Sequence, residues 1–212
     1  NKKVSVQQYL HLAHFRLALG EPTLLVGTFL GDQIKGRLTG RFHPQVEFGI
    51  QLHRKIDAYT DAHAIVKRSY GRLDPKFRRY CPILMDIFYD HILARNWQEF
   101  HHEALQDFND WVFATLEAWH DELPDESRSI ARRMEQSQIL LRYADPGVIP
   151  GILASVGSRL RRANPLAEAY RSLQDNLPCL EADFGAFFPE LLAHVEDAIS
   201  SQATLARKTG EQ

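Results

Sequence analysis

The chain has 212 residues, of which 44% are hydrophobic and 25% charged, which is the balance of a soluble globular protein rather than a disordered one. Its two cysteines exclude a disulfide framework and a four-thiolate zinc site, and no apolar stretch reaches the roughly 18 residues of a membrane-spanning helix. Residues 1–106 carry 15 Lys and Arg against 10 Asp and Glu and hold eight of the ten histidines, whereas residues 107–212 carry 10 against 17. We therefore expect a cytoplasmic protein whose chemistry lies in its basic, histidine-rich half.

Hydrophobic residues recur at helical spacing along the whole chain, and no alternating strand pattern or hairpin dipeptide interrupts them. The sequence predicts an all-α fold, a single-domain helical bundle over residues 1–212, with 1–8 and 206–212 as frayed tails. Predicted helices cover 6–19, 23–36, 44–71, 82–96, 97–120, 125–143, 146–161, 165–176 and 178–205.

Prolines set most of these boundaries, because the residue before a proline is restricted away from the helical region. Asp74 before a proline has the pattern of an N-cap followed by proline at the first helical position. Breaks are expected at Leu123-Pro124, Asp145-Pro146, Asn164-Pro165 and Leu177-Pro178.

The segment from Ile83 to Leu93 is apolar around the whole helical circumference except at Asp86, Asp90 and His91, which predicts a buried helix. Asp86 and Asp90 are four residues apart and share a helix face, so their carboxylates repel each other when both are ionised. A divalent cation beside them removes that repulsion. Ion pairs with Arg or Lys are the alternative interpretation of this pair.

Further segments place metal-type side chains in comparable contexts. His53, Asp57 and Asp61 step by four residues along one predicted helix. Asp32 directly follows an apolar run, and His14 lies within another. Histidine and carboxylate ligands without thiolates suit Mn²⁺, Mg²⁺, Fe or Zn. A solvated helix face explains the first three residues equally well, and His14 or His91 taken singly is more typical of a core histidine bonded to backbone.

Two basic segments are candidates for contact with an acidic partner. Residues 67–79 carry six positive charges and one negative, and residues 158–162 read Ser-Arg-Leu-Arg-Arg within a stretch that has no acid. A solvated surface, or contact with nucleic acid, is the alternative for such segments.

Three motifs together resemble a known family. They are Gly27-x-x-x-x-Asp-x-x-Lys-Gly36, Gly49-Ile-x-Leu-His-Arg-x-Ile-Asp-x-x-Thr-Asp61 and Asp86-x-x-x-Asp-His91. With His14 in its Leu-Ala surroundings, this series is similar to the acyl carrier protein phosphodiesterases, over about residues 10–194. That family is a helical relative of the HD-type metal phosphohydrolases, so the resemblance implies an HD-phosphohydrolase-like fold.

The resemblance implies cleavage of the phosphodiester that joins 4′-phosphopantetheine to a serine of holo-acyl carrier protein, with Mn²⁺ or Mg²⁺ as cofactor. It implies an acidic protein, acyl carrier protein, as the partner, and no nucleic acid or membrane. By position, the expected metal-binding residues are His14, Asp32, Asp57, Asp61, Asp86 and Asp90. Expected catalytic residues are His53 and His91 for proton transfer and Lys35 and Arg54 for charge neutralisation. Expected docking residues are Arg68, Arg72, Arg78, Arg79, Arg159, Arg161 and Arg162.

Two other functions fit the same residues. A metal-dependent phosphohydrolase acting on another phosphodiester or on a nucleotide would share the site but not the docking arginines. A non-catalytic helical binding module would keep the acids as a buried structural network.

Overall fold

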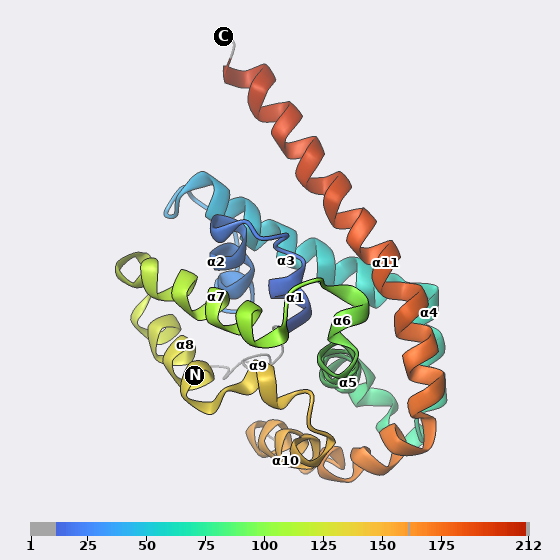
Figure 1. The fold of residues 1–212 in the computed structure, drawn as a ribbon. Coiled ribbons are helices and arrows are strands. Elements are labelled where there is room, and N and C mark those ends of the chain that lie inside the picture. The colour runs from blue at the N-terminus through green and yellow to red at the C-terminus, as the bar shows by residue number, and fades with distance from the viewer. Residues whose placement is uncertain (1–11, 161, 211–212) are drawn as a thin grey trace.

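The computed structural model describes residues 12–160 and 162–210, and within them the chain forms eleven α-helices, short 3-10 turns and no strand (Figure 1). The predicted all-α class is therefore confirmed. Within these residues, no helix is both long and apolar enough to cross a lipid bilayer. The first five helices are α1 (Leu12–Arg16), α2 (Pro22–Gly31), α3 (Pro44–Ala62), α4 (Ala64–Arg72) and α5 (Cys81–Arg95). The others are α6 (Trp97–Phe100), α7 (Leu105–Ala118), α8 (Asp125–Ser137), α9 (Ile139–Arg142), α10 (Ile149–Arg159) and α11 (Ala169–Gly210).

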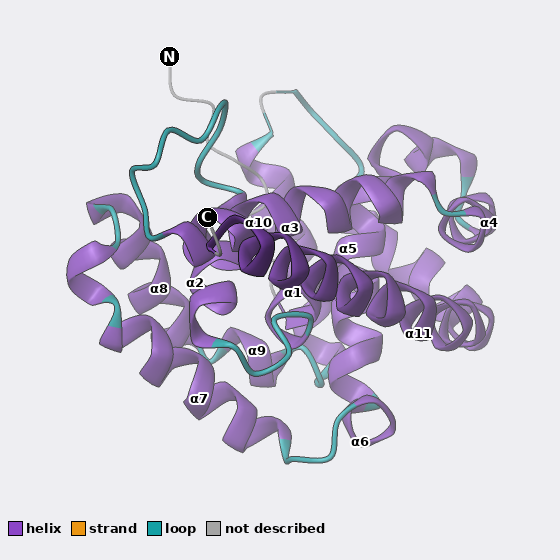
Figure 2. Ribbon diagram, turned by 90° about the horizontal axis from the view of Figure 1, so that it is seen from above, coloured by secondary structure: helices purple, strands orange, loops and turns teal. Residues whose placement is uncertain are grey.

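A continuous hydrophobic core connects these helices, and α5 lies in its middle. Ten consecutive α5 residues from Met85 to Ala94 are buried except Asp86, as the sequence predicts for this segment. The long helix α11 packs against α3, α4 and α5, and its last turns extend past them (Figures 1 and 2). The helix α3 is therefore packed against both α2 and α11.

Two glycines allow α2 and α3 to approach closely. A Cβ atom added at Gly27 would lie 2.4 Å from the Val46 carbonyl oxygen and 2.6 Å from the Gly49 Cα. Contacts this short are not tolerated between real atoms, so the pair of glycines sets the spacing of the two helices. The spacing matters for function, because α3 carries four of the predicted site residues, His53, Arg54, Asp57 and Asp61.

Several predicted helices are shorter or divided in the structure. α1 ends at Arg16 because Leu19 and Gly20 adopt positive φ angles of 53° and 80°. The predicted helix over 44–71 is two helices, since His63 has an extended backbone and its Nδ1 accepts a hydrogen bond from the Ile65 amide. Gln138, with φ of 50°, divides the predicted helix over 125–143 in the same way. Three further predicted helices differ from the structure. The helix predicted over 23–36 ends at Gly31, and the one predicted over 97–120 is interrupted at 101–104. The helix predicted over 146–161 begins with the 3-10 turn Pro146–Val148 and ends at Arg159.

The capping prediction at Asp74 is confirmed, and Asp145, at a predicted break, caps the next segment in the same way. Asp74 Oδ1 accepts a hydrogen bond from the Lys76 amide, and Asp145 Oδ1 accepts one from the Gly147 amide. These caps start the 3-10 turns that precede α5 and α10.

The break predicted at Leu177-Pro178 is wrong, because α11 continues through Pro178 and Pro189 to Gly210. A proline inside a helix costs about 3 kcal/mol. Buried residues on both sides, among them Leu173 and Leu180, offset that cost by packing in the core. Residues 206–210, predicted as part of a frayed tail, are helical, and the tail predicted over 1–8 lies outside the described residues.

Candidate metal centre and active site

A cavity of about 760 Å³ opens between α1, α3, α5, α8, α11 and the loop after α2. One part of its wall is polar and consists of residues the sequence analysis singles out, namely His14, Asp32, Lys35, Asp57, Asp61, Asp86 and Asp90. Another part is apolar and includes Leu17, Ile56, Ile83, Phe184, Phe187, Phe188 and Leu191. The cavity lining thus combines charged and apolar side chains, as ligand-binding sites commonly do.

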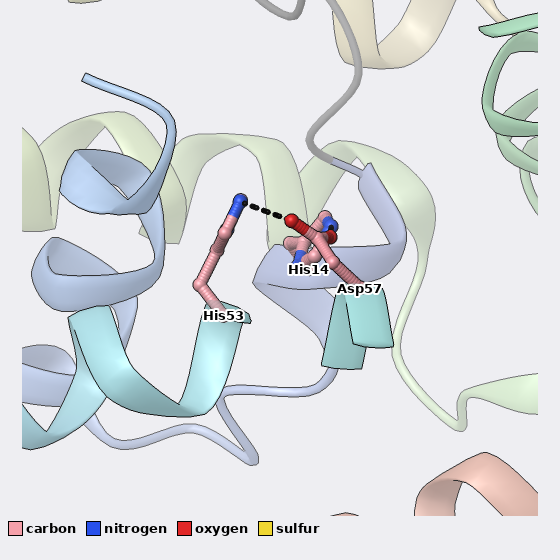
Figure 3. Close-up of side chains that lie close together, drawn as sticks. All are labelled: His14, His53 and Asp57. Atoms are coloured by element: carbon pink, nitrogen blue, oxygen red, sulfur yellow. Dashed lines mark ion pairs between the residues drawn. The ribbon is translucent and has the colours of Figure 1, made fainter. Parts of the chain in front are cut away.

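In the polar part of the wall, Asp57 bridges two imidazole rings. Its Oδ1 lies 3.3 Å from His14 Nε2, and its Oδ2 lies 3.4 Å from His53 Nε2. The two rings stack at a centroid distance of 4.0 Å with an interplanar angle of 18°. Figure 3 shows these side chains converging from α1 and α3. Residues far apart in the sequence therefore meet as the sequence analysis expects.

Asp32 completes the cluster from the end of α2. Its Oδ1 lies 3.4 Å from His53 Nε2, and both side chains are buried. Burial lowers the pKa of His53, but hydrogen bonds and charge attraction from Asp32 and Asp57 outweigh burial and raise the pKa to about 9. Burial raises the pKa of Asp57, but its contacts with His14 and His53 lower that pKa far below the usual range. His53 and Asp57 therefore each favour the charged form of the other.

Local sequence explains how these groups are held. His53 and Asp57 are one helical turn apart on α3, so both point to the same side. Gly31 leaves room for the His53 ring, because a Cβ atom at this position would lie 2.2 Å from His53 Cγ. The helix α2 ends at this glycine, so Asp32 emerges directly beside the ring.

Asp90 positions His14 through the backbone. Its carboxylate accepts hydrogen bonds from the amides of Leu12 and Ala13, at 3.2 Å and 2.9 Å, at the start of α1. Burial raises the pKa of Asp90 to about 7, although the two amides act in the opposite direction. Because α1 has only five residues, this contact fixes the helix that carries His14.

Asp86 and Asp61 also face the cavity. The Asp86 side chain is exposed to the cavity, and its pKa is raised well above the usual range by the surrounding protein and by the carboxylates of Asp57 and Asp90. Asp61 accepts a hydrogen bond from the Tyr70 hydroxyl at 3.4 Å. Within the described part of the chain, neither Asp57 nor Asp86 forms an ion pair with Lys or Arg. The alternative of separate ion pairs for these acids is thus not what the structure shows.

The cluster fits a divalent cation by its chemistry. One nitrogen of His14, one nitrogen of His53 and one oxygen of Asp57 lie within 4.8 Å of one another. Among the described residues, the Nδ1 atoms of His14 and His53 are buried without a hydrogen-bond partner. Buried imidazole nitrogens are normally paired, so these unpaired atoms indicate that the site is built for more than packing. Nitrogen and carboxylate donors at such separations suit Mn²⁺, Mg²⁺, Fe or Zn.

The other predicted catalytic residues lie in different places. Lys35 is exposed at the edge of the cavity. Arg54 does not line the cavity and donates hydrogen bonds to the carbonyls of Ile34 and Gly36, at 2.7 Å and 2.9 Å, so it holds the loop that carries Lys35. His91 is buried away from the cavity wall, with its Nδ1 2.6 Å from the Tyr143 carbonyl oxygen, and burial lowers its pKa. Its position gives no support to the predicted proton transfer.

The predicted docking arginines differ in availability. Arg68 and Arg72 both bind the buried Asp183 of α11, at 2.7 Å and 2.6 Å, and are therefore part of the fold rather than free for a partner. Arg159 is half-buried, and burial lowers its pKa. Three of the remaining four, Arg78, Arg79 and Arg162, are exposed, and Arg161 lies outside the described residues.

The apolar lining of the cavity and one of its cations are not among the residues predicted from the sequence. Phe184, Phe187, Phe188 and Leu191 line the cavity from α11, and their spacing of three, four and seven residues marks one helix face. That stripe is visible in the sequence, but the same pattern is typical of any core-facing helix. Arg41 also lines the cavity, and no motif distinguishes it from a surface arginine.

The fold and the site define an all-helical hydrolase with a histidine and carboxylate centre in a cavity. The sequence model of the acyl carrier protein phosphodiesterase family matches residues 11–191, and the chain belongs to this family. It is therefore a phosphodiesterase. The relation to HD-type hydrolases stays a prediction.

Individual relatives agree with the family assignment. The acyl carrier protein phosphodiesterase of Yersinia enterocolitica is 28% identical over 187 residues, which cover 88% of this chain and 97% of the relative. The protein of the same name from Serratia proteamaculans is 29% identical over 188 residues, covering 88% and 97%. That of Escherichia coli O139:H28 is 30% identical over 183 residues, covering 86% and 95%. No solved structure matches the chain.

Proposed function

We propose that this protein hydrolyses the phosphodiester between 4′-phosphopantetheine and the serine of holo-acyl carrier protein, releasing the apo-carrier protein and 4′-phosphopantetheine. The observation that carries the proposal is the cluster of His14, His53 and Asp57 at the polar part of the cavity wall, in a chain that belongs to this family. The proposed substrate is taken from the name of the family, and the cavity is where we expect that substrate to bind.

We further propose that the cluster holds Mn²⁺ or Mg²⁺. The residues that would hold the cation are His14, His53 and Asp57, with Asp32 beside them. Bound there, the cation would stabilise charge on a phosphoryl oxygen and lower the pKa of a water molecule. His53 is only 1% exposed and does not line the cavity, so we assign it to this centre rather than to proton transfer with the substrate.

In this proposal, side chains at the cavity and in the cluster prepare the site and orient the substrate. Asp32 and Asp57 stabilise the protonated form of His53, and a cation held by His53 would take the place of that proton. Lys35, at the cavity edge, places a positive charge near the entering phosphodiester. The aromatic side chains of Phe184, Phe187 and Phe188 offer the organic arm an apolar surface that excludes water.

The direct test follows apo-carrier formation by mass spectrometry, with purified protein before and after chelation. We expect turnover to disappear with the metal and to return when Mn²⁺ or Mg²⁺ is added. Turnover that survives complete metal removal would contradict the metal centre. Absence of apo-carrier protein under every metal condition would contradict the substrate.

Asp86→Asn separates this proposal from a non-catalytic structural network. In a metal-activated site, the variant loses turnover while its unfolding midpoint is unchanged or raised, because it relieves repulsion among carboxylates. In a structural network, the same variant would lose stability.

A further inference from the structure

Residues 33–43, which follow Asp32 in the loop between α2 and α3, form one edge of the cavity, and we call this segment the rim loop. It carries Lys35, Arg37 and Arg41 and contains no acidic residue. All three cations are exposed, and Lys35 and Arg41 also line the cavity. Among the described residues, the Lys and Arg side chains that line the cavity are Lys35 and Arg41, so this positive charge lies on the rim loop.

The rim loop is held in one conformation rather than left free. Arg54 of α3 donates hydrogen bonds to the carbonyls of Ile34 and Gly36. Gly36 and Gly40 have φ angles of 82° and 77°, in the left-handed region where glycine is favoured, and they bracket the turn that contains Arg37. The cations are therefore presented at a fixed place beside the histidine and carboxylate centre, whose His53 directly precedes Arg54.

The chemistry of the proposed reaction requires a protein contact at this place. In the proposed substrate, the phosphate is bonded directly to a serine oxygen of the partner protein. The partner's surface must therefore come within about one side-chain length of the phosphorus when the bond is cleaved, which is a near-attack requirement. Whatever lies at the opening of the cavity must then touch the partner.

Four of the arginines predicted to dock a partner are less suited to this contact. Arg68 and Arg72 are bound to Asp183. Arg78 and Arg79 belong to the segment Pro75–Tyr80, and Figure 1 shows this connection between α4 and α5 on the opposite side of the molecule from the connection between α2 and α3.

We propose that the rim loop is the docking surface for the protein substrate and that Arg37 and Arg41 bind an acidic face of it next to the modified serine. The inference rests on the proposed function, because it takes a protein-linked phosphodiester as the substrate. Exposed opposite charges at the edge of an interface act mainly on the association rate and on its salt dependence. Docking by these residues therefore governs KM more than kcat.

The experiment compares two charge reversals of equal size. The first is the double variant Arg37→Glu with Arg41→Glu, and the matched control is Arg132→Glu with Arg133→Glu, two exposed arginines of α8. Holo-carrier cleavage is measured at low and high salt, and the binding of fluorescently labelled apo-carrier protein is measured by anisotropy. We expect the rim-loop variant to raise KM at least about tenfold at low salt, to weaken apo-carrier binding similarly and to flatten the salt dependence. The control should stay within about twofold of the wild type.

The outcomes separate the two proposals. Wild-type protein that cleaves bis(p-nitrophenyl) phosphate but not holo-carrier protein would overturn the proposed substrate, and the docking inference with it. Wild-type cleavage of holo-carrier protein with equal KM values in the rim-loop and control variants would overturn the docking inference alone. Thermal unfolding checks both variants, and Arg37→Gln with Arg41→Gln replaces the reversal if the first variant is less stable.

Discussion

Two clusters in this protein contain a carboxylate with several polar neighbours, and they differ in the kind of neighbour. Asp183 of α11 receives hydrogen bonds from Arg68, Arg72 and Ser69, at 2.6–3.0 Å. Asp57 of α3 faces two imidazoles at 3.3 and 3.4 Å, and the Nδ1 atoms of those rings have no partner among the described residues. The first cluster is complete as it stands, whereas the second leaves buried nitrogens unused.

The difference separates a structural carboxylate from a functional one. Burial raises the pKa of Asp183, but its hydrogen bonds from the arginines and the serine outweigh burial and lower the pKa to about 2. Satisfied in this way, Asp183 ties α11 to α4 and so holds the apolar wall of the cavity. In the second cluster, Asp57 and His14 line the cavity, the contacts of Asp57 are longer than those of Asp183, and the Nδ1 atoms of both rings have no partner among the described residues, which is the state expected of a site that binds a ligand.

Asp57→Asn gives the largest expected effect on the functional side of the comparison. The amide cannot bridge two imidazoles as an anion, so we expect kcat for holo-carrier cleavage to fall roughly 10²–10³-fold, the size of losing one preorganised electrostatic contact. Circular dichroism and thermal unfolding should show a retained fold. Asp175→Asn, on the exposed side of α11, is the control and should leave kcat unchanged. A stable Asp57→Asn variant with wild-type kcat would place the chemistry elsewhere.

Asp183→Asn gives the corresponding effect on the structural side. Removing the charge leaves two arginines facing a buried amide, and loss of one member of a buried pair costs about 3 kcal/mol. The measurement is urea unfolding of the variant beside Asp175→Asn, which breaks an exposed pair with Arg171 worth less than about 1 kcal/mol. Equal unfolding free energies for the two variants would show that Asp183 does not stabilise the fold.

Lowering the pH should remove the stabilisation that the Asp183 carboxylate gives to the wild-type fold. The pKa of Asp183 is about 2 in the folded state against an ordinary value of 3.8, so the carboxylate stabilises the fold fully above pH 4. That stability is lost as the pH falls from about 4 to about 2, and it amounts to about 2 kcal/mol. The free energy of unfolding, measured against pH, should fall more steeply in the wild type than in Asp183→Asn over this window. Parallel curves would mean that Asp183 titrates normally.

The helical class and most helix positions are predictable from the sequence, because periodicity and capping residues are local properties. Asp74 is an example, since its cap depends only on the residues that follow it. The continuity of α11 through Pro178 is not predictable locally, because packing on both sides of the proline offsets the lost hydrogen bond. The divisions at His63 and Gln138 likewise lack a glycine or proline that would mark them.

The candidate site, like the fold, is predictable from the sequence only in part. His14, Asp32 and Asp57 stand out in the sequence because polar ligand-type residues in apolar or periodic contexts need a reason, and the structure brings them to one cavity. The roles of Asp90 and Arg54 are not visible in the sequence, since each acts on backbone groups of a distant segment. The same limit applies to the arginines that the sequence predicts for docking. A cluster of positive charge in the sequence does not reveal that Arg68 and Arg72 bind Asp183 of α11.

Gly31→Ala tests how closely the cluster of His14, His53 and Asp57 depends on packing. Of the four tests in this comparison, it has the smallest expected effect. The added Cβ would lie 2.2 Å from His53 Cγ, so the ring must move away from Asp32 and Asp57. We expect about tenfold loss of kcat and about 1–2 kcal/mol of destabilisation, the usual range for one extra methyl group in a packed core. Gly151→Ala, an exposed position of α10 with open space around it, should keep kcat and gain up to about 1 kcal/mol from helix propensity. If Gly31→Ala kept full activity, the position of the His53 ring would not matter to turnover, and the contrast with the rigid Asp183 cluster would rest on Asp57 and His14 alone.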